Sequence, residues 1–96
     1  MFEVLYHQDV ISQDLLRLNR DIRRRIKVAI ENRLRRAPAD YGKPLRGEQK
    51  SYWRLRVGDY RIVYVIERRR VIILQVVHRK DAYRAGIAEA RRKGLL

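Results

Sequence analysis

The feature of this sequence that most constrains its fold is the turn signal Gly58-Asp59, which stands between two segments of alternating side chains. Alternation with a period of two is typical of β-strands, because successive side chains point to opposite faces of a sheet. Glycine in the first place of a two-residue loop favours a type II′ turn, which closes a tight hairpin. The sequence therefore predicts a β-hairpin over residues 52–66.

The expected register of this hairpin separates an apolar face from a basic one. A two-residue loop pairs Val57 with Tyr60 and Arg56 with Arg61, and cross-strand partners share a face. The apolar face, which we expect to pack against helices, carries Trp53, Leu55, Val57, Tyr60, Ile62 and Tyr64. The opposite face, called the arginine face below, carries Arg54, Arg56 and Arg61. Like charges placed opposite each other cost free energy, and no strand carboxylate obviously neutralises them. An anion-binding site explains this better than the alternative, a sheet face whose arginines are splayed into water.

A third strand follows the hairpin. Residues 71–77 are apolar on both faces except at Gln75, as expected for a central strand that is covered on both sides. A three-residue turn at Arg68–Arg70 sets a register that also brings Arg79 to the arginine face. The strand residues that this register places on that face are Val71, Ile73, Gln75 and Val77. A two-residue turn would instead turn the strand over, so the position of Arg79 depends on this turn.

Helical patterns occupy the first third of the chain, after a short strand predicted over residues 2–6. Asp9 is placed to cap a helix over residues 10–18. Asn19 is the candidate cap of a longer amphipathic helix, which Pro38 ends. The apolar stripe of that helix consists of Ile22, Ile26, Ala29, Ile30 and Leu34.

Two further segments complete the expected order of elements. Residues 37–49 hold both prolines and two of the glycines, which predicts a loop. Asp81 is a candidate cap for a last helix over residues 82–93, whose basic end suits the negative helix C-terminus.

Charge is the most unusual property of the composition. Lysine plus arginine number 24 against 11 aspartate plus glutamate, which gives a formal net charge of +13. Such an excess points to a polyanionic partner: nucleic acid, the ribosome or an acidic protein. The predominance of arginine favours RNA or DNA, because guanidinium binds phosphate in a bidentate manner and stacks on bases. A hydrophobic content of 46% excludes a disordered basic tail.

Length and composition also set the class of protein that we expect. Ninety-six residues predict a single domain over residues 1–96. The absence of cysteine excludes disulfides and thiolate chemistry. The sequence has no apolar run long enough to span a membrane and no signal-peptide pattern, so a cytoplasmic protein is expected.

Several kinds of catalytic site find no support in the sequence. His7 and His78 are the only histidines, and their spacing suggests no metal site. The scattered carboxylates do not offer the cluster that a two-metal nuclease needs. Ser12 and Ser51 have no plausible triad. An enzyme built from this chain would therefore work by positioning and by cationic stabilisation.

Three segments together resemble the RelE/ParE superfamily of bacterial and archaeal toxins. They are Lys43-Pro-Leu-Arg-Gly47, Tyr52-Trp-Arg-Leu-Arg-Val-Gly-Asp-Tyr-Arg-Ile-Val-Tyr64 and His78-Arg-Lys-Asp-Ala-Tyr83. The resemblance covers nearly the whole chain. It implies an α+β, RelE-like fold: a small antiparallel β-sheet with two N-terminal helices packed on one face and a short C-terminal helix.

The resemblance also implies an activity and the residues that carry it. RelE-like toxins are ribosome-dependent endoribonucleases that cut messenger RNA in the A site by attack of the substrate's own 2′-hydroxyl, without metal or cofactor. Arg61 would stabilise the charge that develops on the phosphate, and Arg79 would do the same or assist the leaving oxygen. Tyr83 would stack on the exposed base; the alternative is a buried tyrosine that anchors the last helix.

The remaining candidate residues are basic. Arg54 and Arg56 stand where many RelE-like toxins carry basic residues, often lysine. An arginine can bind phosphate but practically cannot act as a base. The base could be His78, whose alternative role is packing at a strand end, or catalysis could be mostly electrostatic. Candidates for contact with RNA or the ribosome are Lys43, Arg46, Arg68, Arg69, Arg70 and Lys80.

Two other functions compete with the nuclease. A ParE-like toxin would inhibit DNA gyrase or another topoisomerase and cut nothing, but such chains generally lack the full set of Arg61, Arg79 and Tyr83. A plain RNA-binding module on the ribosome is the third possibility. For a toxin, the resemblance implies a cognate antitoxin, RelB-like or other, and the charge of this chain predicts that the antitoxin is acidic where it binds.

Overall fold

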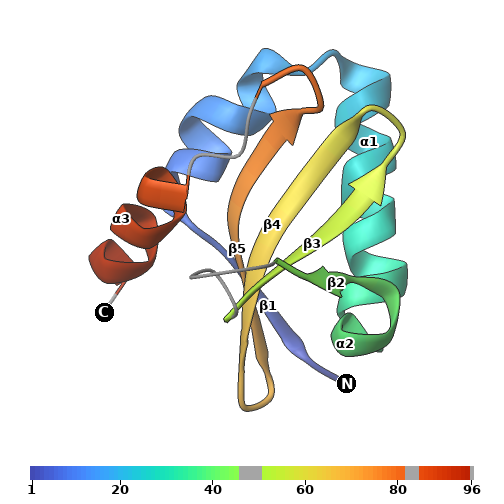
Figure 1. The fold of residues 1–96 in the computed structure, drawn as a ribbon. Helices are drawn as coiled ribbons and strands as arrows, with labels where there is room; N and C mark the ends of the chain where they lie inside the picture. Colours follow the sequence, from blue (N-terminus) through green and yellow to red (C-terminus); the bar gives the residue numbers. More distant parts are fainter. Residues whose placement is uncertain (46–50, 82–84, 96) are drawn as a thin grey trace.

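The alternating segments form the centre of a five-stranded sheet in the computed structural model, which describes residues 1–45, 51–81 and 85–95 (Figure 1). The strand order is β1-β5-β4-β3-β2. The strands are β1 (Glu3–Tyr6), β2 (Lys43–Pro44), β3 (Tyr52–Val57), β4 (Tyr60–Glu67) and β5 (Arg70–His78). Neighbours from β2 to β5 run antiparallel, whereas β1 pairs with β5 in parallel. The predicted α+β class is confirmed, with this one parallel strand added to the antiparallel sheet.

The hairpin β3–β4 has the predicted register. Arg56 pairs with Arg61 and Val57 with Tyr60, around the two-residue turn. Gly58 has a φ of +59°, a backbone angle that residues other than glycine rarely adopt. The arginine face and the apolar face of this hairpin therefore lie where the turn chemistry places them.

The turn between β4 and β5 differs from the three-residue prediction. Glu67 pairs with Arg70, so the turn has two residues, and Arg68 takes the positive φ of +59° that glycine takes in the first turn. The register moves by one residue as a result. The prediction that Val71 and Ile73 lie on the arginine face is wrong, because both pack into the core on the opposite face.

A β-bulge in β5 then returns Gln75 and Val77 to the arginine face, as predicted. Val63 pairs with Gln75 but Tyr64 pairs with Ile73, which leaves Leu74 as the extra residue. The extra residue reverses the alternation along β5. Gln75 and Val77 therefore share the arginine face after all.

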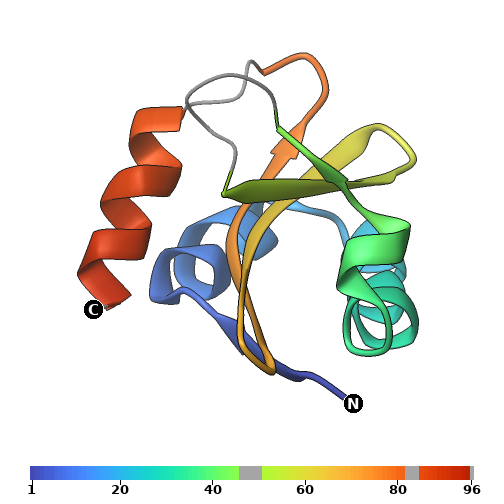
Figure 2. The ribbon, with the colours of Figure 1, turned by 60° about the horizontal axis from the view of Figure 1, so that its bottom comes forward.

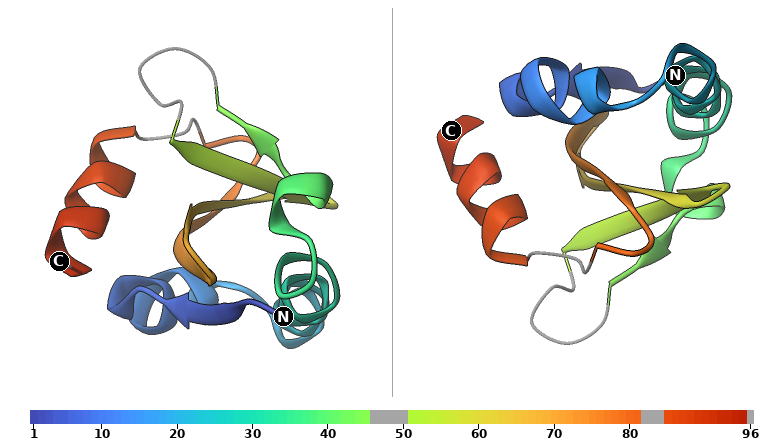
Figure 3. Two further views of the ribbon diagram at one scale, coloured as in Figure 1. Left: turned by 90° about the horizontal axis from the view of Figure 1, so that it is seen from below. Right: turned by 90° about the horizontal axis from the view of Figure 1, so that it is seen from above.

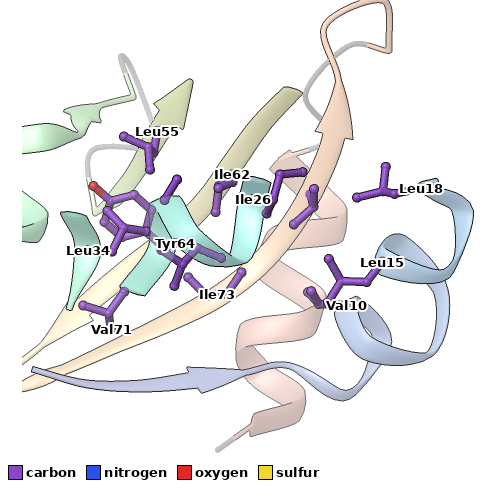
Figure 4. Close-up of a cluster of buried hydrophobic side chains, with 13 residues drawn as sticks. Val10, Leu15, Leu18, Ile26, Leu34, Leu55, Ile62, Tyr64, Val71 and Ile73 are labelled. Atoms are coloured by element: carbon purple, nitrogen blue, oxygen red, sulfur yellow. The ribbon is translucent and has the colours of Figure 1, made fainter. Parts of the chain in front are cut away.

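The apolar face is covered by the N-terminal helical segments. These are η1 (Val10–Asp14), a wide π-helical turn; η2 (Leu15–Arg17), a tighter 3₁₀ turn; α1 (Arg20–Ala29); and η3 (Ile30–Leu34). Figure 4 shows their apolar side chains meeting those of the sheet. The fully buried members of this core include Val10, Ile26, Ile30, Leu34, Ile62, Tyr64, Val71 and Ile73.

Only one of the two predicted N-terminal caps is present. Asn19 Oδ1 accepts a hydrogen bond of 2.9 Å from the Ile22 N–H, as expected for an N-cap. The cap predicted at Asp9 is wrong: Asp9 has helical dihedral angles and its side chain makes no capping bond. Its carboxylate instead lies 3.7 Å from Arg91 Nε, which offers a charged partner.

The predicted loop over residues 37–49 contains two short elements in its described part. Pro38 opens helix α2 (Pro38–Tyr41), where its missing N–H costs nothing. The Tyr64 hydroxyl donates to the Pro38 carbonyl at 2.7 Å. A Cβ at Gly42 would collide with that hydroxyl, which explains glycine at this position. Strand β2 then follows and extends the sheet.

Helix α3 (Ala85–Leu95) lies on the other side of the sheet from α1 (Figure 2). Its Ala88 joins a second buried cluster on the arginine-face side, formed by Tyr52, Val63, Val65, Ile72 and Leu74. The first three residues of the predicted helix, 82–84, lie outside the described residues. The cluster covers one end of the arginine-face side and leaves the arginines at the other end.

Candidate anion-binding site

The centre of the candidate site is the cross-strand pair Arg56 and Arg61. Directly opposed residues have Cβ atoms roughly 4.5–5.5 Å apart, so the two side chains start from neighbouring points on one face. Arg56 is exposed and Arg61 is half-buried, with its Nη1 donating to the Tyr60 carbonyl at 3.2 Å. Within the described part of the chain neither guanidinium has a carboxylate partner. The register of the hairpin therefore places the two side chains on one face, and no described carboxylate neutralises their charge.

Two more basic residues extend this centre toward the sheet edge. Arg54 is half-buried on the same face as Arg56, and it pairs with Lys43 of β2. Because cross-strand partners share a face, the exposed Lys43 also lies on the arginine face. Arg54 and Arg56 of β3, Arg61 of β4 and Lys43 of β2 thus place four basic residues on one face of the sheet.

Arg79 reaches the site from the end of β5, but it has an acidic neighbour. Its backbone N–H donates to the Asp59 carbonyl at 2.7 Å, and its Nε lies 3.5 Å from Asp59 Oδ1. Arg79 therefore has a carboxylate beside it, which the turn supplies rather than a strand. Both side chains of the pair are about 60% exposed, and an exposed ion pair of this kind contributes little free energy. Arg79 remains able to exchange Asp59 for another anion.

His78 lies on the opposite face from the arginines. It pairs with Tyr60, and the two rings meet edge to face with centroids 5.1 Å apart. Its Nδ1 accepts a hydrogen bond of 3.1 Å from the Lys80 backbone N–H. A neutral imidazole in this arrangement carries its proton on Nε2, so it presents a donor rather than a free base.

The three arginines of the second turn lie far from this site. Arg68, Arg69 and Arg70 lie at the far end of β4, and an eight-residue strand spans roughly 26 Å. Arg69 there lies over the Phe2 ring, 5.5 Å from its centroid. Lys80 is exposed just beyond β5. Arg46 and Tyr83 lie outside the described residues.

The sequence analysis missed the ion pair that joins α3 to the rest of the fold. Arg91 Nη1 lies 2.7 Å from Asp14 Oδ2, and both side chains are nine-tenths or more buried. Asp14 also accepts from the Val76 N–H at 2.9 Å, and Arg91 donates to the Leu74 carbonyl at 2.8 Å. We call this arrangement the Asp14–Arg91 clamp. Asp14 and Arg91 are 77 residues apart in the sequence, so no local sequence pattern predicts their contact.

The second polar attachment of α3 involves Tyr52 and Arg92. The Tyr52 hydroxyl donates to Glu89, and Arg92 Nη2 lies 2.8 Å from Glu67 Oε2. Burial, followed by the hydrogen bond to Glu89, raises the pKa of Tyr52 to about 12. These contacts place Arg92 of α3 beside a carboxylate, unlike Arg56 and Arg61, which have none among the described residues.

The described residues contain neither a cluster of metal ligands nor a membrane-spanning helix. No three histidine or carboxylate side chains in the described ranges group together as metal ligands would. Among the helices of those ranges, none has the length and apolar character needed to cross a bilayer.

Comparisons with known proteins relate the chain to toxins. Residues 4–83 match the family described as the ParE toxin of type II toxin-antitoxin system, parDE. Over 53 residues the chain is 47% identical to the curated Toxin RelG of Mycobacterium tuberculosis, an alignment that covers 53% of this chain and 61% of that toxin. The match to this relative therefore spans less than two thirds of its length.

Solved structures with the same fold include toxin–antitoxin complexes. A chain of the RelBE2 complex from Mycobacterium tuberculosis is 33% identical with a TM-score of 0.74, over 83% of this chain and 93% of that one. A chain of the RelB–RelE complex from Methanococcus jannaschii is 30% identical with a TM-score of 0.64, over 79% and 91%. The isolated E. coli RelE toxin, 18% identical with a TM-score of 0.67 over the whole of both chains, is similar in fold.

Proposed function

The chain belongs to the ParE toxin family of type II toxin–antitoxin systems, within the RelE/ParE superfamily, and from this premise we propose that it is a ribosome-dependent endoribonuclease that cuts messenger RNA in the A site. The observation that carries the proposal is the pair Arg56–Arg61, which has no acidic partner among the described residues. The similarity to RelG and to a chain of RelBE2 also favours the nuclease.

The proposed reaction needs charge stabilisation above all. The substrate's 2′-hydroxyl oxygen attacks the adjacent phosphorus, the bond to the 5′-oxygen of the next nucleotide breaks, and the products are a cyclic phosphate and a 5′-hydroxyl. Negative charge grows on the phosphate oxygens in the transition state. Arg61, fixed by its bond to the Tyr60 carbonyl, and Arg56, opposite it, are placed to receive that charge. Arg54 would bind a neighbouring phosphate along the same row.

The two proton transfers of this reaction involve solvent rather than the arginines. The 2′-hydroxyl proton leaves to a base that the arginines do not provide, since guanidinium does not deprotonate in proteins. His78 lies on the other face with Nδ1 in use, so it does not serve as that base in this arrangement. We therefore propose a mostly electrostatic mechanism in which solvent takes this proton. Arg79, able to leave Asp59, would stabilise the charge on the departing 5′-oxygen, and solvent would supply the proton that this oxygen takes up. Tyr83 would stack on the base.

The proposed mechanism uses no metal and no cofactor. Both phosphate charge and leaving-group charge are met by guanidinium groups that the fold already holds on one face. The ribosome supplies the in-line geometry of the messenger RNA, and its presence as the target sets the cytoplasm as the place of action. Lys43, Arg68, Arg69, Arg70 and Lys80 would meet ribosomal RNA, since all five are exposed.

We also propose an acidic antitoxin as the partner that keeps the chain silent. Antitoxins are present in the two complexes whose chains resemble this one. A groove of about 340 Å³ runs along α1, with Val28, Ala29 and Val57 as apolar lining and Arg24, Arg25 and Arg33 as its basic residues. The outer edge of β3 beyond Arg54 has no described strand partner. An acidic segment could add to this edge and reach the groove at once.

The experiment that tests the proposed function is induced expression followed by mapping of messenger RNA 5′ ends. Cuts that fall at codon positions and appear only with ribosomes would support the nuclease. The family description itself favours a second candidate, a ParE-like inhibitor of DNA gyrase. Loss of supercoiling activity in a purified gyrase assay, with intact messenger RNA, would select that candidate and overturn the nuclease.

A further inference from the structure

A cavity opens beside the arginine face, around the free edge of β5. Its volume is about 530 Å³, within the usual range of ligand pockets. The elements that line it are η1 and η2, the end of β5, and α3, which lie next to one another around that edge (Figure 3). The proposed function leaves this cavity without a role.

The buried polar side chain in the cavity wall that lacks a partner is Gln75. It is only 4% exposed, yet its amide makes no hydrogen bond to any residue that the structure describes. Among the described residues the fully buried polar atoms without a partner are Arg23 Nε and Arg92 Nε, so the Gln75 amide atoms retain a little solvent contact. The other buried polar residues of the wall, Asp14 and Arg91, satisfy each other in the clamp. Gln75 is therefore the group that is free to bind a ligand.

The cavity begins next to the residue that would bind the reacting phosphate. Val77 lines the cavity and pairs with Arg61 on the neighbouring strand. Adjacent strands lie about 4.8 Å apart. A base belonging to a nucleotide beside that phosphate can therefore turn into the cavity while the phosphate stays on the arginine face.

The chemistry of the wall fits a nucleobase better than a free anion. A glutamine amide presents a donor and an acceptor side by side, which matches the hydrogen-bonding edge of a base. Tyr60 and His78 supply aromatic surface. The exposed carboxylate of Asp81 disfavours a free phosphate and can accept from an exocyclic amino group. Arg17, also exposed, can meet the phosphate of the same nucleotide.

We propose that this cavity is a nucleobase subsite and that Gln75 reads the edge of one base of the RNA substrate. The inference rests on the proposed function, because it assigns to this site the selection of a nucleotide next to the cut. A bidentate amide contact discriminates among bases by roughly fivefold to 150-fold. One base is therefore preferred at one fixed position relative to the cleaved bond.

The first test measures binding without any cleavage. The purified full chain is titrated with each of the four ribonucleoside monophosphates and followed by NMR. We expect one nucleotide to bind about fivefold or more tightly than the others. Gln75→Leu, which keeps the size of the side chain, should abolish this preference. Gln8→Leu, the same change at an exposed glutamine outside the cavity, should leave it intact.

The second test compares the cut sites of the two variants on ribosomes. Gln75→Leu should flatten the base preference at one position, and Gln8→Leu should not. Cleavage with an unchanged profile in a folded Gln75→Leu protein overturns the base subsite and leaves the nuclease standing. Nucleotide binding that depends on Gln75 without any cleavage keeps the subsite and overturns the nuclease. No saturable binding of any nucleotide, or equal losses in both variants, also overturns the subsite.

Discussion

Arginines occupy both ends of one side of the sheet, but the two ends have opposite surroundings. Under α3, Arg91 and Arg92 lie against Asp14 and Glu67. At the other end, Arg56 and Arg61 face each other with no carboxylate partner among the described residues. Paired arginines hold elements together, whereas unpaired ones hold a positive charge ready for an anion. The same residue type thus has a structural role where a carboxylate pairs with it and is available to an anion where none does.

The largest expected effect comes from breaking the paired end. Asp14→Ala removes the carboxylate from a buried pair and also leaves the Val76 N–H without its acceptor. The free energy of unfolding should fall by about 3–5 kcal/mol. Chemical denaturation with a circular-dichroism readout measures this change. Glu67→Ala, which breaks the more exposed pair with Arg92, is the matched control and should cost about 1 kcal/mol or less. Equal losses in the two variants would contradict the distinction between the clamp and an ordinary ion pair.

The next effect falls on the unpaired end and on activity alone. Arg61→Ala should slow messenger RNA cleavage by raising its activation free energy by about 2.7–4 kcal/mol, by analogy with the loss of one oxyanion donor. Its stability should change little, because Arg61 has no carboxylate partner among the described residues and gives up only one hydrogen bond, to the Tyr60 carbonyl. Cleavage kinetics and thermal melting of the same preparation measure the two quantities. Full activity in a folded variant would remove Arg61 from the site.

A pH titration sharpens the comparison at the covered end. The pKa of Tyr52 is raised to about 12 from the usual value near 10, so the folded state favours the neutral phenol. Its contribution to stability is complete below pH 10 and is lost as the pH rises through 12. Tyr52→Phe should therefore show a shallower loss of stability than the parent between pH 10 and 12. Parallel curves for the two proteins would show that the Tyr52–Glu89 contact does not hold α3 at alkaline pH.

The smallest effect concerns an arginine that belongs to neither end. Arg68 has φ of +59° in the second turn, a conformation that costs most residues free energy. Arg68→Gly should stabilise the fold by roughly 0.5–1 kcal/mol. Arg69→Gly, at a negative φ in the same turn, is the control and should destabilise it. Denaturation midpoints decide the sign. A fall in ribosome-dependent cleavage in Arg68→Gly would in addition support contact between this turn and ribosomal RNA.

The sequence predicts the first hairpin well because its information is local. Gly58 determines the turn, the turn determines the pairing of Arg56 with Arg61, and that pairing places the arginine face. The second turn carries no such signal, since its positive φ falls on Arg68 rather than on glycine. The bulge at Leu74 also has no local sequence signal, because it depends on how the two ends of β5 pack against their different neighbours.

Contacts between distant parts of the chain account for the rest of what sequence reasoning missed. The partners of the clamp, Asp14 and Arg91, stand in segments whose patterns suggest only an amphipathic turn and a basic helix end. Asp9 has the right spacing for a cap but finds Arg91 instead. That the Gln75 amide makes no hydrogen bond to a described residue likewise follows only from the packing of η1, η2 and α3 beside β5. Each of these depends on tertiary packing rather than on local propensity.

The clamp has a consequence for how molecules of this chain behave toward one another. Beyond Ile73 no described strand lies beside the edge of β5, since β1 ends there. An uncovered edge of this kind is a template on which a second chain can grow a continuous sheet. Asp14 already takes the Val76 N–H and Arg91 already takes the Leu74 carbonyl. The same two side chains that hold the last helix therefore also act as a guard against aggregation, with a buried charge standing where an intruding strand would have to pair.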